Sequence, residues 1–407
     1  MRVSIALGRL PGFDWSVLRQ ERHFHFRRIA DRQRAVLGVG EVECVDAPDF
    51  DEQGRARDWY FATLPYEWKE AIQHAVDTRS ASGTWSMPRF VVEWKGEEVW
   101  MHVRQADVDQ AHAWAERAFI DAPDTGGPPR ITWSMHCDRE RYLANVQHLL
   151  AHIQRGDIYE INYCTTRSAT VPGFDPYRAF RTLLLHSDAP FAAFARSDDG
   201  YVLCASPERF LAFDGRRVIG QPMKGTRPRS FDQATDRRHM EELASDAKER
   251  SENIMALDVM RHDLSRIAAS GTVQVEELCA VRSYPRVHQM VSTVSAVIAE
   301  ELTALDVLRA AFPMASMTGA PKVRAMELIR EVEDGPRGMF SGSLGFLAPD
   351  GTGDFNVVIR SLLFDGATGR LSLTTGSAIT ARCDAVQEYE ECQLKAFSVI
   401  DALHDDR

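Results

Sequence analysis

One lysine stands in an unusual local setting. In the stretch GQPMKGTRPR, residues 220–229, Lys224 lies between a proline and a glycine, and the acid Glu208 lies upstream in SPERF. An acid and an amine that approach each other can act as proton donor and nucleophile. The alternative is an ordinary solvated lysine that follows the end of a strand. The course of the surrounding strands decides between the two.

A hairpin is predicted between these two residues. Asp-Gly at 214–215 is typical of a two-residue turn, and a turn at this point places Glu208 opposite Gln221. Odd spacing along a strand then puts Gln221 and Lys224 on opposite faces. Pro222 cannot donate to a strand ladder and is tolerated at a bulge. A bulge at Pro222 would return Lys224 to the face that carries Glu208.

Four carboxylates are the second candidate for chemistry. Glu249 and Glu252 are three residues apart on one predicted helix, and Glu388 and Glu391 repeat this spacing on another. Residues three apart share one face of a helix. Oxygen ligands in such pairs suit Mg²⁺, which often bridges to an anionic substrate. The alternative is two ordinary acidic helix surfaces.

Apolar periodicity and turn residues predict the elements that must position these side chains. Helices are predicted over 138–156, over 245–271 with Ser245 as its cap and Gly271 as its end, from Pro321 onward and from Asp384 onward. Strands are predicted at 191–196, 201–206, 209–215, 216–221, 341–347, 356–364 and 370–377. Because the strands come as antiparallel hairpins and the helices come singly, we expect an α+β fold with antiparallel sheets.

The composition argues against several kinds of partner. The 407-residue chain has 48 Lys plus Arg and 59 Asp plus Glu, so its formal net charge is −11. An acidic chain without a long basic run argues against nucleic acid or an anionic membrane as the main partner. The seven cysteines form no CxxC pair, and no apolar run approaches the length of a membrane span. We therefore expect a cytoplasmic protein with reduced thiols.

The sequence changes near residue 130, from irregular to regularly periodic segments. Proline and glycine cluster in APDTGGPPR, residues 122–130, which is the best candidate for a linker. We expect an N-terminal region over 1–130 that forms part of the same globule, followed by a catalytic domain over 131–407.

Nine motifs occur in order over about residues 135–402. They are GDIYEINY (156–163), SPERFL (206–211), PMKGTRPR (222–229), KERSENIMALDVMRHDL (248–264), YPRVHQMVSTV (284–294), SMTGAPKVRAMELI (316–329), FSGSLGF (340–346), DFNVVIRS (354–361) and EYEECQLKA (388–396). The set resembles the chorismate-utilising enzymes, a family that includes anthranilate, aminodeoxychorismate, isochorismate and salicylate synthases. The resemblance implies two stacked antiparallel β-sheets with helices packed outside, and chorismate as the substrate.

The residue before Gly-Thr separates the members of this family. The lysine of PMKGT is similar to the aminodeoxychorismate synthase branch, whereas anthranilate synthases resemble PIAGT. The resemblance implies that Lys224 bonds to the chorismate ring while Glu208 handles the leaving hydroxyl. Ammonia then displaces the lysine and gives 4-amino-4-deoxychorismate, in para-aminobenzoate and folate biosynthesis. Isochorismate and salicylate synthases resemble a lysine at the position of Glu160, which argues against hydroxylation of the ring here.

The resemblance also implies the binding residues. Mg²⁺ would hold the ring carboxylate of chorismate against the four carboxylates Glu249, Glu252, Glu388 and Glu391, with help from Lys395. Arg360 and the backbone around Thr226 and Gly376 would hold the enolpyruvyl carboxylate, a task that suits the two-pronged geometry of arginine.

The implied reaction places opposite demands on two side chains. A free lysine has a pKa near 10.4, so Lys224 must become neutral, by removal from water or beside a cation. Glu208 must be protonated when it acts as an acid, which apolar or anionic surroundings favour.

Several residues depart from the family pattern, and they leave the lysine and the four carboxylates untouched. They are His262, Gln289, Phe340, Arg382, Cys383 and the loop Gly376–Ile379. For the unpaired His262 and His288 we expect structural roles. Two other functions stay open: anthranilate synthase component I, and a non-catalytic chorismate-binding subunit. The chain shows no glutaminase signature, so ammonia is expected from solution or from a separate glutamine amidotransferase.

Overall fold

The computed structural model describes residues 2–10, 12–68, 83–120 and 131–404. The expected linker at 122–130 lies outside these residues. In the N-terminal third, the strands are β1 (Arg2–Gly8), β2 (His23–Ile29), β3 (Arg34–Val45), β4 (Tyr60–Leu64), β5 (Thr84–Lys95) and β6 (Glu98–Arg104), followed by helix α2 (Val108–Ala118). Short 3₁₀ turns at Trp15–Gln20, Ala30–Arg32 and Gln105–Asp107 connect them.

The remainder of the chain carries more strands and nearly all of the described helices. The strands are β7 (Ser134–Met135), β8 (Glu160–Thr170), β9 (Ala193–Ser197), β10 (Gly200–Cys204), β11 (Arg209–Asp214), β12 (Arg217–Gly220), β13 (Met223–Pro228), β14 (Gln274–Ser283), β15 (Val287–Val297), β16 (Gly319–Ala320), β17 (Ser343–Leu347), β18 (Thr352–Asn356), β19 (Ser361–Asp365) and β20 (Arg370–Thr380). The helices are α3 (Arg139–Arg155), α4 (Pro176–Ser187), α5 (Gln233–Ser245), α6 (Ala247–Ser265), α7 (Ala304–Ala311), α8 (Lys322–Val332) and α9 (Ala385–His404), with a 3₁₀ turn at Ala315–Met317.

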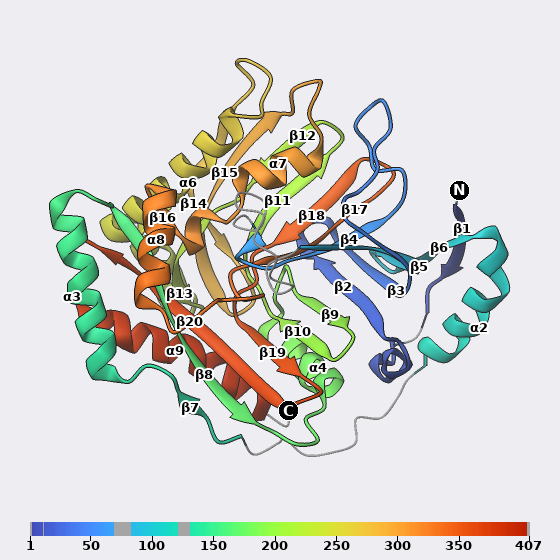
Figure 1. The fold of residues 1–407 in the computed structure, drawn as a ribbon, viewed down its shortest axis with the longest axis horizontal. Helices are drawn as coiled ribbons and strands as arrows, with labels where there is room; N and C mark the ends of the chain where they lie inside the picture. The colour runs from blue at the N-terminus through green and yellow to red at the C-terminus, as the bar shows by residue number, and fades with distance from the viewer. Residues whose placement is uncertain (1, 11, 69–82, 121–130, 405–407) are drawn as a thin grey trace.

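The strands form two antiparallel arms that meet at β5 (Figure 1). The first arm runs in the order β1, β6, β5, β3, β2, β9, β10, β19, β20 and β8. The second runs β5, β4, β17, β18, β11, β12, β15 and β14, and β13 pairs with β15 beside β12. The expected α+β fold with stacked antiparallel sheets is therefore confirmed, with the addition that β5 joins the two sheets into one hydrogen-bonded network.

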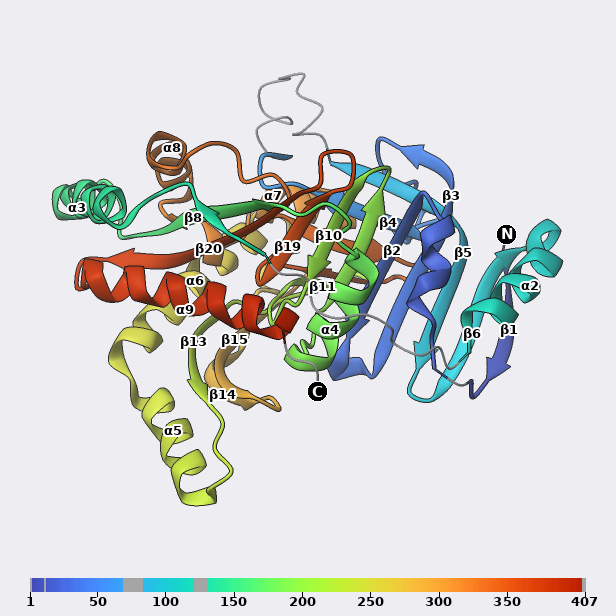
Figure 2. The ribbon, with the colours of Figure 1, turned by 90° about the horizontal axis from the view of Figure 1, so that it is seen from below.

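Apolar residues of the two arms pack face to face. Ala193 and Ala195 of the first arm share a buried cluster with Leu344 of the second, as alternating strand residues must when one face of each sheet is buried. Helices cover the outer faces: α9 lies along β20 and contacts α3 and α4, whereas α6 packs on β13 and β15. Figure 2 shows α5 projecting away from the body of the molecule below α6.

Most of the predicted elements are present. The helix predicted at 138–156 is α3, in which the Asp138 side chain accepts from the N–H of Arg141 and Gly156 takes a left-handed conformation at the end. The predicted helix from Pro321 is α8. The helix from Asp384 is α9, and the Asp384 carboxylate accepts from the N–H groups of its first turn.

Two predicted boundaries are wrong. The helix expected over 245–271 is α6, which is shorter at both ends, because Asp246 begins it by accepting from the N–H groups of Lys248 and Glu249. Helix α5, which ends at Ser245, had not been predicted. Asp246 and not Ser245 is the cap, and α6 ends at Ser265, before Gly271.

The strand expected over 356–364 is also broken. β18 ends at Asn356 and β19 begins at Ser361. Arg360 adopts a left-handed φ of 52°, and the N–H of Ile359 bonds to the carbonyl of Val357. This tight turn carries the chain from the second arm to the first, since β18 pairs with β11 and β19 with β10.

Candidate active site

Lys224 lies on β13, next to a bulge. β12 and β13 continue one register along β15, with Gly220 opposite Val294 and Met223 opposite Val291. The extra residue comes after the lysine, because Gly225 has a φ of +83° and shifts the ladder there. The bulge predicted at Pro222 is therefore misplaced by three residues, since a position that needs positive φ selects glycine over proline.

The register of the predicted hairpin is also wrong, and the correction brings the acid closer to the amine. Asp214 pairs with Arg217, so the loop is 215–216 and Gly215 takes the positive φ of 58°. The register is thus shifted by two residues, and its continuation beyond Leu211 and Gly220 puts Glu208 opposite Met223 instead of Gln221. The N–H of Met223 donates to the Glu208 carboxylate. Glu208 consequently lies across from the immediate neighbour of Lys224.

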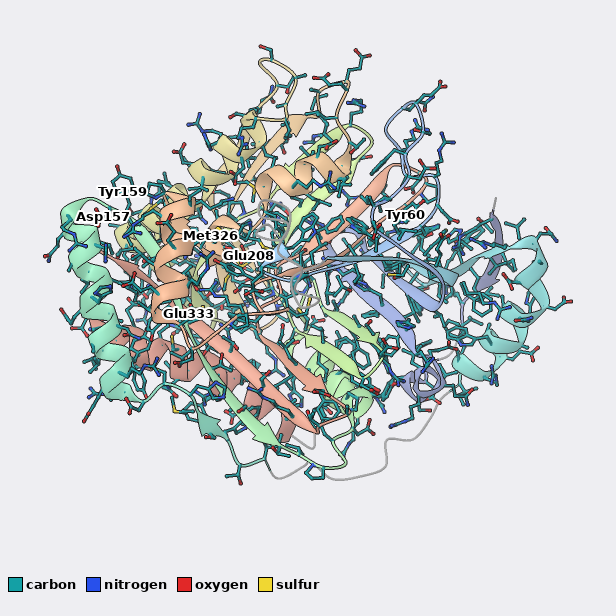
Figure 3. All side chains as sticks on the ribbon, in the orientation of Figure 1. Tyr60, Asp157, Tyr159, Glu208, Met326 and Glu333 are labelled. Atoms are coloured by element: carbon teal, nitrogen blue, oxygen red, sulfur yellow. The ribbon has the colours of Figure 1, made fainter. Side chains whose placement is uncertain are left out.

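Glu208 lies in surroundings that favour its protonated form. It is only 4% exposed and near the middle of the molecule (Figure 3). The Ser316 hydroxyl donates to its Oε1 at 2.7 Å. Burial raises the pKa of Glu208 to about 7, although Ser316 and Lys224 oppose the rise. A carboxyl group with this pKa can donate a proton near neutral pH, as the sequence-based prediction required.

Lys224 is buried among carboxylates. Its Nζ donates to Glu160 Oε1 at 2.8 Å, and both side chains are largely removed from water. Burial alone lowers the pKa of Lys224, but the negative charges of Glu160, Glu252 and Glu208 outweigh it and raise the pKa above its ordinary value. Of the two expected routes to a neutral amine, burial is therefore outweighed here by the surrounding carboxylates, which favour the protonated lysine.

The four predicted carboxylates come from two helices that meet at one lysine. Lys248 Nζ donates to Glu388 Oε1 at 2.9 Å on α9 and lies 3.9 Å from Glu252 Oε1 on α6. Charge interactions link Lys248 to Glu391 and to Glu249 as well. The two helices therefore bring all four carboxylates within the range of charge interaction with one lysine.

The donor set has the chemistry of a magnesium site. All four side chains offer carboxylate oxygens, the ligands that Mg²⁺ prefers. The Oε1 atom of Glu252 is buried without a hydrogen-bond partner, and burial raises the pKa of this carboxyl to about 7. Among the described residues, however, no three acidic, cysteine or histidine side chains are arranged closely enough to hold an ion as they stand.

Two of the residues predicted to bind substrate contact each other, and one of them pairs with a carboxylate. Lys395 Nζ donates to the carbonyl of Gly376 at 2.9 Å and pairs with Glu391. A Cβ atom at Gly376 would lie 2.4 Å from Cys164 Sγ, so only glycine lets β20 approach β8 here.

The other two residues predicted to bind substrate are Arg360 and Thr226. Arg360 is half-buried in the turn before β19 and donates to Ser398 Oγ at 2.7 Å. Glu391 acts on its pKa, which places Arg360 near the carboxylates. Thr226 is exposed on β13 opposite Gln289.

Three residues that contact the site were not predicted for it. Glu160 had been used only to argue against ring hydroxylation, and neither Lys248 nor Ser316 had been singled out. All three stand in the quoted motifs, and the (i, i+4) spacing of Lys248 and Glu252 was visible in the sequence. Their contacts with residues far along the chain were not.

The departures from the family pattern fall into different surroundings. His262 is exposed on α6, and Phe340 is buried in the apolar core. His288 is buried between the Ser283 hydroxyl and the Asp236 carboxylate, which agrees with a structural role. Gln289 is buried and its Oε1 has no hydrogen-bond partner.

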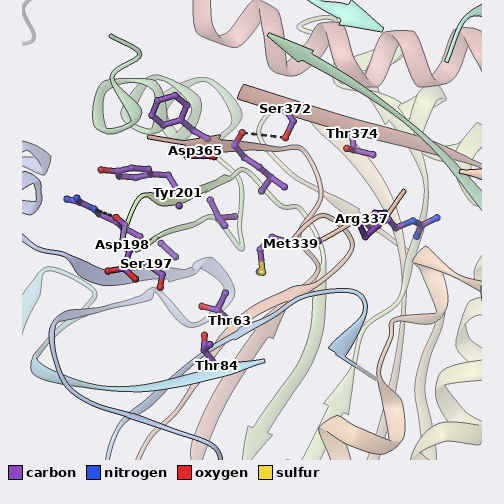
Figure 4. A pocket seen from close by; sticks show the side chains of 18 of the residues that line it. Thr63, Thr84, Ser197, Asp198, Tyr201, Arg337, Met339, Asp365, Ser372 and Thr374 are labelled. Carbon is purple, nitrogen blue, oxygen red and sulfur yellow. Dashed lines mark hydrogen bonds between the residues drawn. The ribbon is translucent and has the colours of Figure 1, made fainter. Parts of the chain in front are cut away.

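A cavity of about 1060 Å³ opens elsewhere, between β2, β4 and β10 and the turn at residues 333–339 (Figure 4). None of the ten predicted site residues lines it. Its buried arginine, Arg337, is already paired with Glu333. The predicted site at Lys224 and the carboxylates is therefore separate from this cavity. Within the described residues, no helix is long and apolar enough to cross a bilayer.

Comparison with solved structures agrees with the fold. The menaquinone-specific isochorismate synthase of Escherichia coli superposes with a TM-score of 0.82 at 16% identity, covering 99% of this chain and 94% of that one. Anthranilate synthase component I of Streptococcus pneumoniae superposes with a TM-score of 0.75 at 22% identity, covering 98% and 92%. At these identities the likeness establishes the fold alone.

Sequence comparison gives the family. Aminodeoxychorismate synthase component 1 of Escherichia coli is 39% identical over 285 residues, which are 70% of this chain and 62% of that protein. Anthranilate synthase component 1 of Thermus thermophilus is 39% identical over 307 residues, 73% of this chain and 65% of that protein. The chain thus spans about three fifths of the length of these relatives. The model of the chorismate binding enzymes matches residues 19–401, and the chain belongs to this family.

Proposed function

We propose that the protein aminates chorismate to 4-amino-4-deoxychorismate, with Lys224 as the nucleophile and Glu208 as the acid. The observation that carries this proposal is that the charge of the largely buried Lys224 acts on Glu208, a buried carboxyl group whose pKa is raised to about 7. The similarity to aminodeoxychorismate synthase component 1 of Escherichia coli supports it.

The site residues divide the chemical work. Neutral Lys224 forms a bond from Nζ to the ring, while the hydroxyl leaves as water with the proton of Glu208. Glu160, whose Oε1 lies 2.8 Å from Nζ, is placed to accept the proton that Lys224 must lose first. Ammonia then bonds to the ring and the lysine leaves.

The same site would bind substrate and metal. Glu249, Glu252, Glu388 and Glu391 would hold Mg²⁺, which supplies the positive charge that a dianionic substrate needs near these carboxylates. Lys395, Arg360 and the backbone at Thr226 and Gly376 would contact the substrate carboxylates. Ammonia would come from solution or from a separate glutamine amidotransferase. A place in para-aminobenzoate and folate biosynthesis, and a cytoplasmic location, stay predictions.

Anthranilate synthase component 1 is the second candidate, because the Thermus thermophilus protein is as similar in identity as the Escherichia coli one. Lys224 opposes it, since the anthranilate branch resembles alanine at this position.

Product analysis distinguishes the two. Purified protein with chorismate, Mg²⁺ and an ammonium salt should yield 4-amino-4-deoxychorismate without pyruvate, whereas anthranilate with equal pyruvate would establish the second candidate. A protein that consumes no chorismate would have a binding role only.

The covalent step has its own test. Lys224→Arg should reduce amination by about 10³-fold or more, because a guanidinium does not deprotonate near neutral pH. Lys95→Arg, at an exposed lysine on β5, should leave the rate unchanged. Wild-type turnover in Lys224→Arg would make Lys224 a positioning charge.

A further inference from the structure

Lys248 bridges the two helices that carry the carboxylates. It lies in the first turn of α6, and its ammonium reaches Glu388 on α9 at 2.9 Å and Glu252 at 3.9 Å. The Lys248 side chain is 46% exposed, while those of Glu388 and Glu252 are 3% and 8% exposed. Lys248 therefore extends from the solvent side onto two buried carboxylates.

The ammonium is held there by charge. Its Nζ donates to one buried carboxylate on α9 and lies within ion-pair distance of a second on α6. The lysine thus acts as a monovalent counter-ion of the cluster.

The ammonium of Lys248 leaves one carboxylate oxygen of the cluster without a hydrogen bond. Glu252 Oε1 keeps no hydrogen-bond partner although it is buried, and a buried acceptor without a partner costs free energy. A lysine ammonium has three N–H donors, and at 3.9 Å from this oxygen it is too far to donate. The charges of both Lys224 and Lys248 act on Glu252, yet this oxygen accepts a hydrogen bond from neither and is open to another cation.

We propose that Lys248 is a built-in competitor for the metal: it holds Glu388 and Glu252 until a divalent cation binds there and displaces its ammonium toward solvent. This inference rests on the magnesium site of the proposed function. Two positive charges cannot share these oxygens at short range without strong repulsion, so cation binding includes the work of removing the lysine. Because Lys248 is half exposed, it can leave without repacking the core.

The consequence is a metal affinity weaker than the carboxylates alone would give. Removing the charge of Lys248 should therefore tighten binding of the metal, whereas removing a permanent ligand or a purely structural contact would weaken it or leave it unchanged.

Titration calorimetry of Mg²⁺ into the full chain, without chorismate, tests this. Lys248→Met keeps most of the side-chain length without the charge, and its Kd for Mg²⁺ should fall at least about 5-fold below that of wild type. Lys248→Gln should behave in the same way and serves as the second variant if the first does not fold, as judged by circular dichroism. The matched control is Lys95→Met at the exposed lysine of β5, which should bind as wild type does.

Acylation of lysines followed by mass spectrometry supplies a readout of the movement itself. In wild type, Mg²⁺ should increase the labelling rate of Lys248 and leave that of Lys95 unchanged, because the displaced amine becomes more exposed and loses its carboxylate partners.

The outcomes separate the two proposals. Wild type that binds Mg²⁺, with neutral variants that bind it equally or more weakly, or with Lys248 labelling that Mg²⁺ does not increase, would overturn the competitor role alone. Absence of Mg²⁺ binding in wild type and all variants at tens of millimolar would overturn the magnesium site and this inference with it.

Discussion

Replacing Asp354 with asparagine should destabilise the N-terminal third of the chain, although Asp354 lies far from it in sequence. The carboxylate is fully buried on β18 and pairs with two buried arginines, Arg27 of β2 at 2.5 Å and Arg209 of β11 at 2.8 Å. Arg209 also pairs with Asp31. Asp354 thus links both arms of the fold, and a neutral amide would leave Arg27 without its charged partner.

The expected size follows from this geometry. Removal of one member of a buried ion pair costs about 3–5 kcal/mol, and the remaining Asp31–Arg209 pair favours the lower end. With a urea dependence of about 3 kcal/mol per M, reasonable for a large domain, the loss of about 3 kcal/mol lowers the unfolding midpoint by about 1 M.

The distribution of tryptophan makes the assay specific. All eight tryptophans lie between Trp15 and Trp133, so their fluorescence reports on the N-terminal third, whereas far-ultraviolet circular dichroism reports mainly on helices beyond it. If residues 1–130 belong to the same cooperative unit, both signals should shift together in Asp354→Asn. The control Glu97→Gln removes the exposed partner of Arg9 and should shift neither by more than about 0.3 M, since exposed pairs contribute little. A fluorescence midpoint that stays at the wild-type value would refute the coupling.

Two further predictions concern the site. Mg²⁺ should raise the melting temperature of wild type, because a ligand that binds only the folded state stabilises it. Glu391→Gln should abolish this rise, whereas the control Glu390→Gln, at an exposed residue of the same helix, should retain it. An unchanged rise in Glu391→Gln would show that Glu391 is not a ligand. Burial raises the pKa of Glu208 from 4.5 to about 7. Between these two pH values the folded protein therefore holds a proton that the unfolded chain releases. The contribution of this group to stability is fully present below about pH 4.5 and is lost as the pH rises to about 7. Glu208→Gln, which cannot ionise, should therefore show a smaller decline in urea midpoint between pH 5 and pH 7.5 than wild type, and an equal decline would contradict the raised pKa.

Local sequence determined much of the fold. The apolar period of 3.6 and the flanking Asp138 and Gly156 were sufficient to predict α3 to within a residue, because caps and periodicity act within a few residues of one another. The strand patterns and hairpin order were sufficient for the α+β class. Ordered motifs were sufficient for the family and for Lys224 as the residue to test, since residue type and neighbours are properties of the chain itself.

Tertiary structure decided what lies between distant segments. A loop at 215–216 in place of 214–215 moved Glu208 from opposite Gln221 to opposite Met223, because register depends on which loop residue adopts positive φ. The partner of Lys224 is Glu160, 64 residues away along the chain. The three carboxylates around that lysine raise its pKa although burial by itself would lower it, a balance that residue type alone did not reveal. Periodicity predicts which face of an element is buried. A contact between residues so far apart in sequence depends on the path of the whole chain, and the electric field at a buried amine depends on it as well.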